Sequence, residues 1–129
     1  MIQRFIKLGE GYNDIYELIE LARTNKNRLH MLLQLDTIIS DRPMSSIVLI
    51  LQPATPGKMM PLFICLEGIV SPTYKETERY QLITSLADEL NTTIHRLEVR
   101  PSSSFSEEEL YFHYLIGVLR MNRYIPPLQ

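Results

Sequence analysis

The segment Leu29-His30-Met31-Leu32-Leu33-Gln34-Leu35-Asp36 decides the fold, because its apolar residues recur with a period of two, as in a half-buried strand. A turn cluster at 40–43 follows, and the aliphatic run at 46–52 is too short for a typical helix. These two segments predict a β-hairpin, with a helix through the first segment as the alternative. Residues 62–70 supply a third strand after the break at 53–58, so we expect an antiparallel meander at the centre of the fold.

Apolar spacing predicts further elements on both sides of this meander. Strands are expected at 2–8 and 94–99, and helices at about 14–24 and 107–122, with one more helix between the third and the last strand. The order along the chain is then βαβββαβα. It predicts an α+β domain with a five-stranded mixed, largely antiparallel sheet and three helices.

Two of the helices are preceded by capping sequences. Ser71-Pro72-Thr73 predicts a helix that begins at Pro72, after a Ser71 cap, or two residues later, because proline suits the first helical position. In the last helix, Ser106 as N-cap would place Glu109 at the third helical position for a capping box. Phe105 and Leu110 would then form a hydrophobic staple across the cap.

Both faces of the predicted sheet centre are apolar. Leu32 and Ile38 lie opposite the main apolar row of their strand, and residues 47–51 are apolar at every position. A further layer must therefore cover the second face. Either the third helix supplies it, giving a three-layer domain, or a second copy of the chain does. We favour a homodimer, because two-fold pairs are the commonest oligomers.

Length and composition indicate one globular domain. The 129 residues are 45% hydrophobic and 22% charged, so we expect a single domain over 1–129 with a short C-terminal tail at about 123–129. The net charge of −2 gives no electrostatic reason to expect a nucleic-acid partner. No apolar run approaches the length that crosses a bilayer or follows the start as a signal peptide would. The single cysteine, Cys65, suits a reducing compartment, and we predict a cytoplasmic protein without a membrane partner.

The loop Gly9-Glu10-Gly11-Tyr12-Asn13-Asp14 is the best-placed candidate for a small ligand. It joins a predicted strand to a helix start, where backbone amides and the helix dipole receive phosphate groups. It lacks the third glycine of a dinucleotide loop and the Lys-Ser/Thr ending of a P-loop, and its acids would repel an anion. The predicted binding residues are Gly9, Gly11, Tyr12, Asn13 and Tyr16; glycines serving a tight turn are the simpler interpretation.

No catalytic or metal-binding motif is present in the sequence. His30, His95 and His113 show none of the spacings that place metal ligands on one element. Cys65 has apolar neighbours, which disfavour a reactive thiolate. The glutamates at 107–109 fall in a first helical turn, where capping and the helix dipole explain them. We therefore predict no catalytic residue, no metal site and no cofactor.

The last helix is apolar over more than one stripe. Phe112, His113 and Arg120 lie on arcs beside its predicted core face. Tyr124 follows in the tail, and tyrosine and arginine are favoured anchors of protein interfaces. These residues predict an interface, with a tail folded back onto its own domain as the alternative.

The start of the chain resembles a known group of proteins. Residues 1–12, Met-Ile-Gln-Arg-Phe-Ile-Lys-Leu-Gly-Glu-Gly-Tyr, with Asp14-Ile15-Tyr16-Glu17-Leu18, are similar to the opening of an uncharacterised family of small cytosolic proteins of low-GC Gram-positive (Bacillus-type) bacteria. The resemblance implies a cytoplasmic location. It supplies no activity, catalytic residue or cofactor.

The sequence predicts a non-enzymatic interaction or regulatory module that self-associates. Its working surface would be the uncovered sheet face or the last helix and tail. The alternative is a small-ligand binding protein or enzyme, for phosphate or nucleotide ligands, with a pocket near the 9–14 loop.

Overall fold

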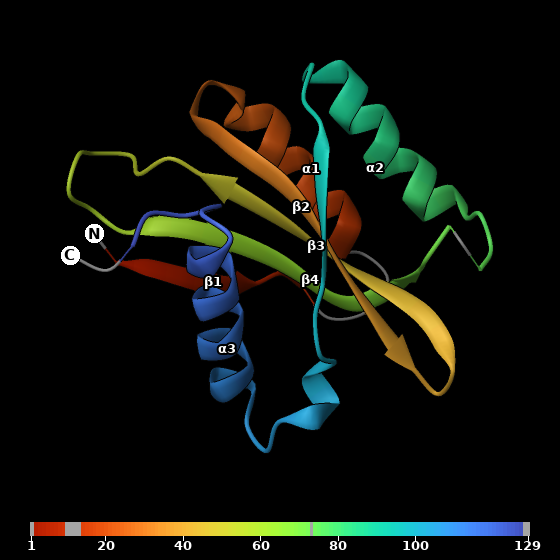
Figure 1. Cartoon of the computed structure of the whole chain (residues 1–129). Helices are drawn as coiled ribbons and strands as arrows, with labels where there is room; N and C mark the ends of the chain where they lie inside the picture. Colours follow the sequence, from red (N-terminus) through yellow and green to blue (C-terminus); the bar gives the residue numbers. More distant parts are fainter. Residues whose placement is uncertain (1, 10–13, 73, 128–129) are drawn as a thin grey trace.

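The computed structural model describes residues 2–9, 14–72 and 74–127 (Figure 1). Its elements confirm the predicted α+β class and the predicted order along the chain, with two short 3₁₀ turns added. The elements are β1 Gln3–Lys7, α1 Asp14–Thr24, η2 Lys26–Arg28, β2 Leu29–Ile39, β3 Arg42–Leu51, β4 Met60–Val70, α2 Glu78–Glu89, β5 Ile94–Glu98, η3 Ser102–Ser104 and α3 Glu108–Met121.

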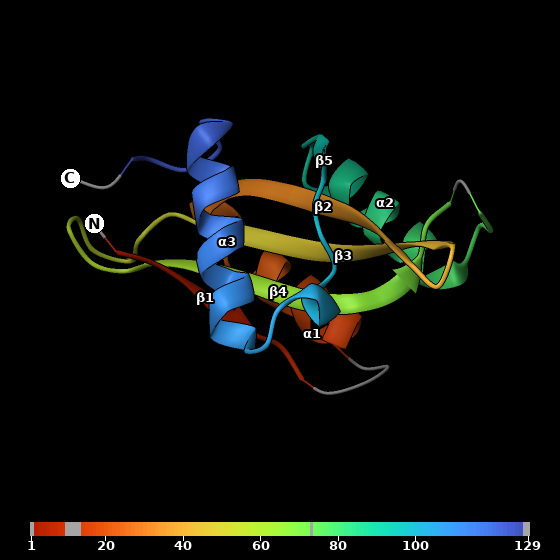
Figure 2. The same cartoon turned by 60° about the horizontal axis from the view of Figure 1, so that its bottom comes forward.

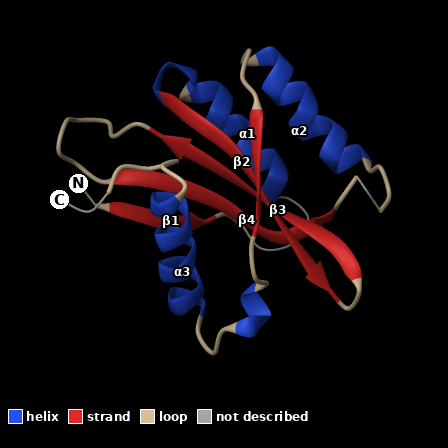
Figure 3. Cartoon of the chain, in the orientation of Figure 1, coloured by secondary structure: helices blue, strands red, loops and turns tan. Residues whose placement is uncertain are grey.

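The sheet has five strands in the order β1-β4-β3-β2-β5, all labelled in Figure 2. The strands are drawn in red in Figure 3. The predicted meander is confirmed, since β2 pairs antiparallel with β3 and β3 antiparallel with β4. The two outer strands are parallel to their neighbours, β1 to β4 and β5 to β2. Both outer strands are short and carry charged residues, which protects the sheet edges from pairing with another chain.

The helices cover both faces of the sheet. Helices α1 and α2 lie on one face, and α3 crosses the other (Figure 2). Each interface is a separate apolar core. The first contains Ile15, Leu18, Leu32, Ile47, Leu49, Cys65, Ile83 and Leu86, and the second contains Phe5, Leu33, Leu35, Val48, Ile50, Leu62, Ile64, Tyr111, Leu115 and Leu119. The third helix thus supplies the second covering layer, so the apolar sheet face by itself no longer argues for a dimer.

The predicted start of α2 was wrong. The N-cap of α2 is Thr77, whose side chain accepts a hydrogen bond from the backbone N–H of Tyr80 at 3.3 Å. Ser71 instead closes the end of β4: its N–H donates to the carbonyl of Pro43, and its own carbonyl accepts from Tyr74 and Lys75. These bonds hold the segment in a turn, so the helix begins only after it.

The predicted cap of α3 was also wrong, by one residue. Its N-cap is Glu107, without a side-chain capping bond, so the Ser106–Glu109 capping box does not form. Phe105 packs on Tyr111, with ring centroids 5.5 Å apart, whereas Leu110 is 46% exposed. The staple contact thus joins Phe105 to the residue after the predicted one.

A buried ion pair ties the two helices of the first face together. The guanidinium of Arg79 in α2 donates to a carboxylate oxygen of Asp14 in α1 at 2.6 Å and to the carbonyl of Gly68 in β4 at 2.6 Å. The side chains of Arg79 and Asp14 are 9% and 7% exposed. Burial raises the pKa of Asp14, while the charge of Arg79 opposes that rise. Arg79 therefore connects α2, α1 and the sheet at one point.

Candidate functional site

The predicted ligand loop is only partly described. Gly11, Tyr12 and Asn13 lie outside the described residues. The N–H of Gly9 donates to a carboxylate oxygen of Glu17 at 3.0 Å, and the side chain of Tyr16 is 45% exposed. A carboxylate of the chain therefore takes the amide that a phosphate would need, and the prediction of a site at this loop gains no support from its described residues.

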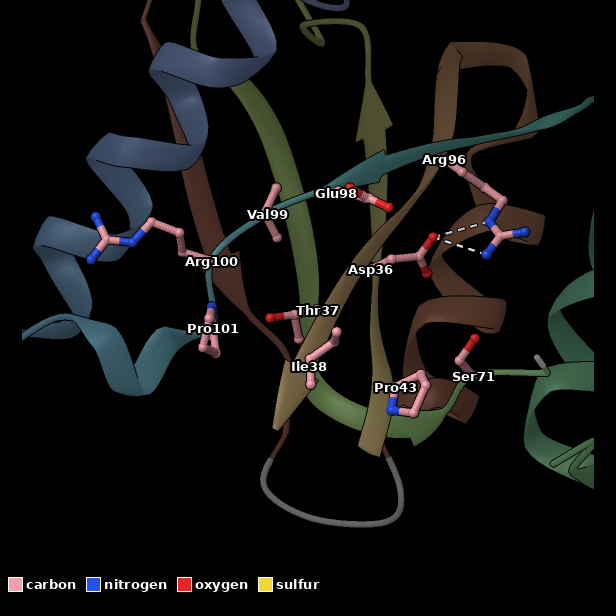
Figure 4. A pocket seen from close by; sticks show the side chains of 10 residues that line it. All are labelled: Asp36, Thr37, Ile38, Pro43, Ser71, Arg96, Glu98, Val99, Arg100 and Pro101. Atoms are coloured by element: carbon pink, nitrogen blue, oxygen red, sulfur yellow. Dashed lines mark hydrogen bonds and ion pairs between the residues drawn. The ribbon is translucent and has the colours of Figure 1, made fainter. Parts of the chain in front are cut away.

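One pocket lies at the end of β5, beside the last residues of β2 (Figure 4). Its volume is about 520 Å³, and Asp36, Ile38, Arg96, Glu98 and Arg100 are among its lining residues. The guanidinium of Arg96 pairs with Asp36 at 3.0 Å, and that of Arg100 points away, 5.0 Å from the centre of the Phe105 ring. Both arginines of this edge pocket are thus engaged within the chain.

Asp36 also belongs to a polar network under α2. It accepts hydrogen bonds from the amide of Gln34 at 2.6 Å and from the hydroxyl of Ser45 at 3.0 Å. The carbonyl oxygen of Gln34 in turn accepts from the hydroxyl of Tyr80 at 2.6 Å. Gln34 and Ser45 are fully buried. A buried network whose members satisfy one another gives rigidity, and this explains these residues without a ligand.

A second pocket, the tail pocket, lies between the end of α3, the C-terminal tail and the start of β2. It has a volume of about 470 Å³ and is lined by His30, Arg120, Arg123, Tyr124, Ile125, Pro126 and Pro127. No carboxylate is among these described lining residues. The tail is held over β2 by the imidazole of His30, whose Nε2–H donates to the carbonyl of Tyr124 at 2.8 Å while Nδ1 accepts from Gln52 at 2.8 Å. The tail pocket is therefore lined by basic and apolar groups.

The outward side of α3 differs from that of the other two helices. The exposed positions of α2 are Glu78, Gln81, Ser85, Asp88 and Glu89, and those of α1 are mostly charged. In α3, the exposed positions after the two glutamates are Leu110, His113, Gly117 and Met121. We call Leu110, Tyr114, Gly117 and Met121 the outer stripe. Tyr114 lies at its border: its ring packs on Phe105, with centroids 5.1 Å apart, and its hydroxyl accepts from the N–H of Arg100 at 3.2 Å. Leu110 is 46% and Met121 85% exposed, Gly117 is exposed and Tyr114 half-buried. A helix exposed on one side normally carries polar residues there.

None of the described residues packs against the position of Gly117. A Cβ atom added to it would find no atom within 4 Å. Glycine inside a helix costs about 1 kcal/mol relative to alanine. The described residues thus leave the choice of glycine at this position unexplained, and a close neighbour outside the chain would explain it.

The predicted interface residues are spread over several environments. The ring of Phe112 stacks on Phe5, with centroids 5.2 Å apart, and Arg120 donates to the side-chain oxygen of Gln3 in β1. Tyr124 is half-buried in the tail pocket. Among the four, only the side chain of His113 is largely exposed, at 68%, beside the outer stripe. The prediction of the last helix as an interface stays open, and its most exposed apolar residues, Leu110 and Met121, were not among those predicted.

The histidines and acids show no metal centre within residues 2–9, 14–72 and 74–127. No group of three or more His, Cys, Asp or Glu side chains there is arranged to hold an ion. His30 and His95 both lie near Tyr124, His95 at 5.6 Å between ring centroids. His113 lies on the far side of α3, on its outer surface.

Cys65 lies in the first core, and burial raises the pKa of its thiol. Since alkylation requires the thiolate, we expect native Cys65 to react with iodoacetamide at least about 100-fold more slowly than in urea. Mass spectrometry of timed samples measures both rates. Similar rates in the two conditions would show that the thiol is accessible and that this core is open.

The fold and these surfaces define a three-layer α+β domain with an apolar third helix. A family model described as "Domain of unknown function (DUF7147)" matches residues 1–125, and the chain belongs to that family. Comparison with curated proteins and with solved structures found no match. Among the described residues, no helix is long and apolar enough to span a membrane.

Proposed function

We propose that the protein is a cytoplasmic, non-enzymatic interaction module that forms a homodimer through the outer stripe of α3. The observation that carries the proposal is Gly117, an exposed mid-helix glycine that no described residue packs against, on the same side of α3 as the exposed Leu110 and Met121. The reduced, buried state of the single cysteine supports the cytoplasmic location.

The spacing of the outer stripe supports a helix as its partner. Its residues follow one another at intervals of four, three and four, which is the spacing of the contact seam between two packed helices. Leu110 and Met121 form the ends of the stripe, and Tyr114 and Gly117 form its middle. The stripe is therefore symmetric about its own midpoint in position, with one large and one small residue at the centre.

This symmetry favours a second copy of the same chain in antiparallel orientation. A two-fold axis through the midpoint would set Tyr114 of each copy over Gly117 of the other, and Leu110 against Met121. In an isologous interface, each such contact occurs twice. Because Gly117 has no side chain, it would leave room for the ring of Tyr114. This contact would account for the presence of glycine, which weakens the isolated helix.

Charge supports the same orientation. The first turn of α3 carries Glu108 and Glu109, and the exposed Arg123 follows its last turn. An antiparallel pair would bring the acidic end of each helix beside the basic end of the other. A parallel pair would bring like charges together, which is unfavourable.

The expected dimer is weak. Helix α3 has 14 residues and is therefore about 21 Å long. One such helix contact buries less than the roughly 800 Å² per partner of a standard interface. We expect a dissociation constant on the order of 10–100 μM, so dimers would form and separate readily.

The double substitution Leu110→Gln/Met121→Gln tests the proposal. Both residues are exposed, so the fold should be retained, while two polar ends on the stripe should weaken the dimer at least about 10-fold. Sedimentation equilibrium between about 10 μM and about 1 mM measures the association of wild type and variant. The matched control is Ile38→Thr/Tyr74→Gln, which alters two exposed apolar residues away from α3. A wild type that stays monomeric, or equal effects of both variants, would refute the proposal.

Gly117→Ala separates the stability of the chain from its association. The added methyl group meets no atom of the residues that the structure describes, so we expect the monomer to gain about 0.5–1 kcal/mol. The same methyl group would push against Tyr114 of the second copy and weaken the dimer. Thermal unfolding at low concentration and sedimentation at high concentration measure the two effects. A dimer that keeps its affinity or tightens would remove Gly117 from the interface.

A further inference from the structure

Arg120 lacks a carboxylate partner in the described part of the chain. The only hydrogen bond of its side chain there joins Nη2 to the neutral side chain of Gln3. Its Nε atom is buried without any hydrogen-bond partner among those residues. A partly buried guanidinium without a counter-charge is unfavourable, so an anion bound beside it would relieve that cost.

Arg123 brings a second guanidinium to the same pocket at a strained backbone position. Its N–H donates to the carbonyl of Arg120, and the next N–H, of Tyr124, donates to the carbonyl of Leu119. These two bonds end α3 in a Schellman motif, whose left-handed position usually holds glycine or asparagine. Helix α2 follows the rule with Asn91, at φ of 53°, whereas α3 has Arg123, at φ of 61°. The local backbone does not favour arginine there, so the reason lies with its side chain.

We propose that the tail pocket binds the phosphate group of a small organic phosphate. The planar guanidinium of Arg123 offers paired N–H donors that match phosphate oxygens, and Arg120 adds a second positive charge beside it. Tyr124, Ile125 and Pro126 supply an apolar wall for the organic part. The volume of about 470 Å³ is within the range of small-molecule sites.

His30 positions this site without contacting the phosphate. Both of its ring nitrogens are used: Nε2–H by the carbonyl of Tyr124 and Nδ1 by the amide of Gln52. It therefore fixes the tail against β2 and keeps Tyr124 and its neighbours over the pocket. The tail pocket and the outer stripe lie on different arcs of α3. Arg120 reaches toward β1, whereas the outer stripe faces away from the sheet.

Arg123→Asn is the sharpest test, because asparagine suits the left-handed position and Arg123 has no ion pair or side-chain hydrogen bond within the described residues. Inorganic phosphate and phenyl phosphate serve as probes, titrated at constant ionic strength and followed by amide chemical shifts. We expect saturable binding by the wild type, with the organic phosphate bound more tightly than inorganic phosphate. Arg123→Asn should weaken both at least about 5-fold without lowering the melting temperature.

The controls separate this site from general charge effects and from dimerisation. Arg4→Gln removes an exposed arginine of β1 that does not line the tail pocket and should leave the titration unchanged. The stripe variant Leu110→Gln/Met121→Gln should still bind phosphate, because its tail pocket is intact. An absence of saturable binding in both the wild type and the stripe variant would overturn the inference. So would equal losses in Arg123→Asn and Arg4→Gln, each also measured in the background of the stripe variant so that the result does not depend on whether the dimer forms.

Discussion

Arg79→Met is expected to lower the free energy of unfolding by about 3–5 kcal/mol, because it leaves the carboxylate of Asp14 buried without its partner. Asp14 is 5% exposed and accepts a hydrogen bond from Arg79 at 2.6 Å. The carbonyl of Gly68 loses a donor at the same time. Urea unfolding followed by circular dichroism measures the change.

The loss should depend on pH. Without Arg79, the pKa of Asp14 in the folded state rises further above its value in the unfolded chain. The destabilisation caused by Arg79→Met is therefore absent below the pKa of Asp14 in the unfolded chain. It grows as the pH rises through the pKa of Asp14 in the folded state. The difference between the wild type and Arg79→Met should be smaller near pH 4 than near pH 7.

Arg23→Met is the matched control for this ion pair. Arg23 also joins α1 to α2, through Glu89 at 2.8 Å, but both side chains are about half exposed. Exposed pairs contribute little, so this variant should change stability only slightly. Comparable losses in the two variants would show that the burial of the Asp14–Arg79 pair has no special weight.

Leu115→Ala is expected to lower the free energy of unfolding by about 2–5 kcal/mol, because Leu115 is fully buried in the core beneath α3. The cavity would lie between α3 and the sheet, where the surrounding side chains fill it only in part. Leu110→Ala on the same helix is the control, since Leu110 is 46% exposed. Denaturant unfolding at a concentration that keeps the chain monomeric measures both. A small loss for Leu115→Ala would mean that α3 does not hold the second face closed.

The meander was predictable because its period-two pattern and turn cluster are local signals. Its place between β1 and β5 was not. Residues 47–51 are apolar on both faces, so they do not indicate which strand lies beside them. The parallel pairing of β1 with β4 and of β5 with β2 brings together segments far apart in the chain, and it depends on packing that no local pattern encodes.

The start of α3 shows how packing selects between neighbouring caps. Ser106 and Glu107 both precede a run that can form a helix, and the capping-box rule favours Ser106. The rings of Phe105 and Tyr111, 5.5 Å apart, instead set the frame in which Glu107 is the cap. Tertiary contacts therefore outweighed a local preference of about 1 kcal/mol.

The candidate interface was predictable to the level of one helix. The apolar content of α3 indicated it, but the stripe that stays exposed depends on how the helix rotates against the sheet. The stacking of Phe112 on Phe5 turns that residue inward and leaves Leu110 and Met121 outside. The tail pocket gave no sequence signal, since His30 and Arg123 are far apart in the chain.

Disulfide cross-linking across the outer stripe tests the central claim most directly. In the antiparallel dimer, Leu110 of each copy lies against Met121 of the other, and the native Cys65 is buried and does not interfere. Under mild oxidation, the variant Leu110→Cys/Met121→Cys should form covalent dimers rapidly, and the control variant Ile38→Cys/Tyr74→Cys should form few. Equal cross-linking of the two variants, or a chain that stays monomeric throughout, would contradict self-association through α3.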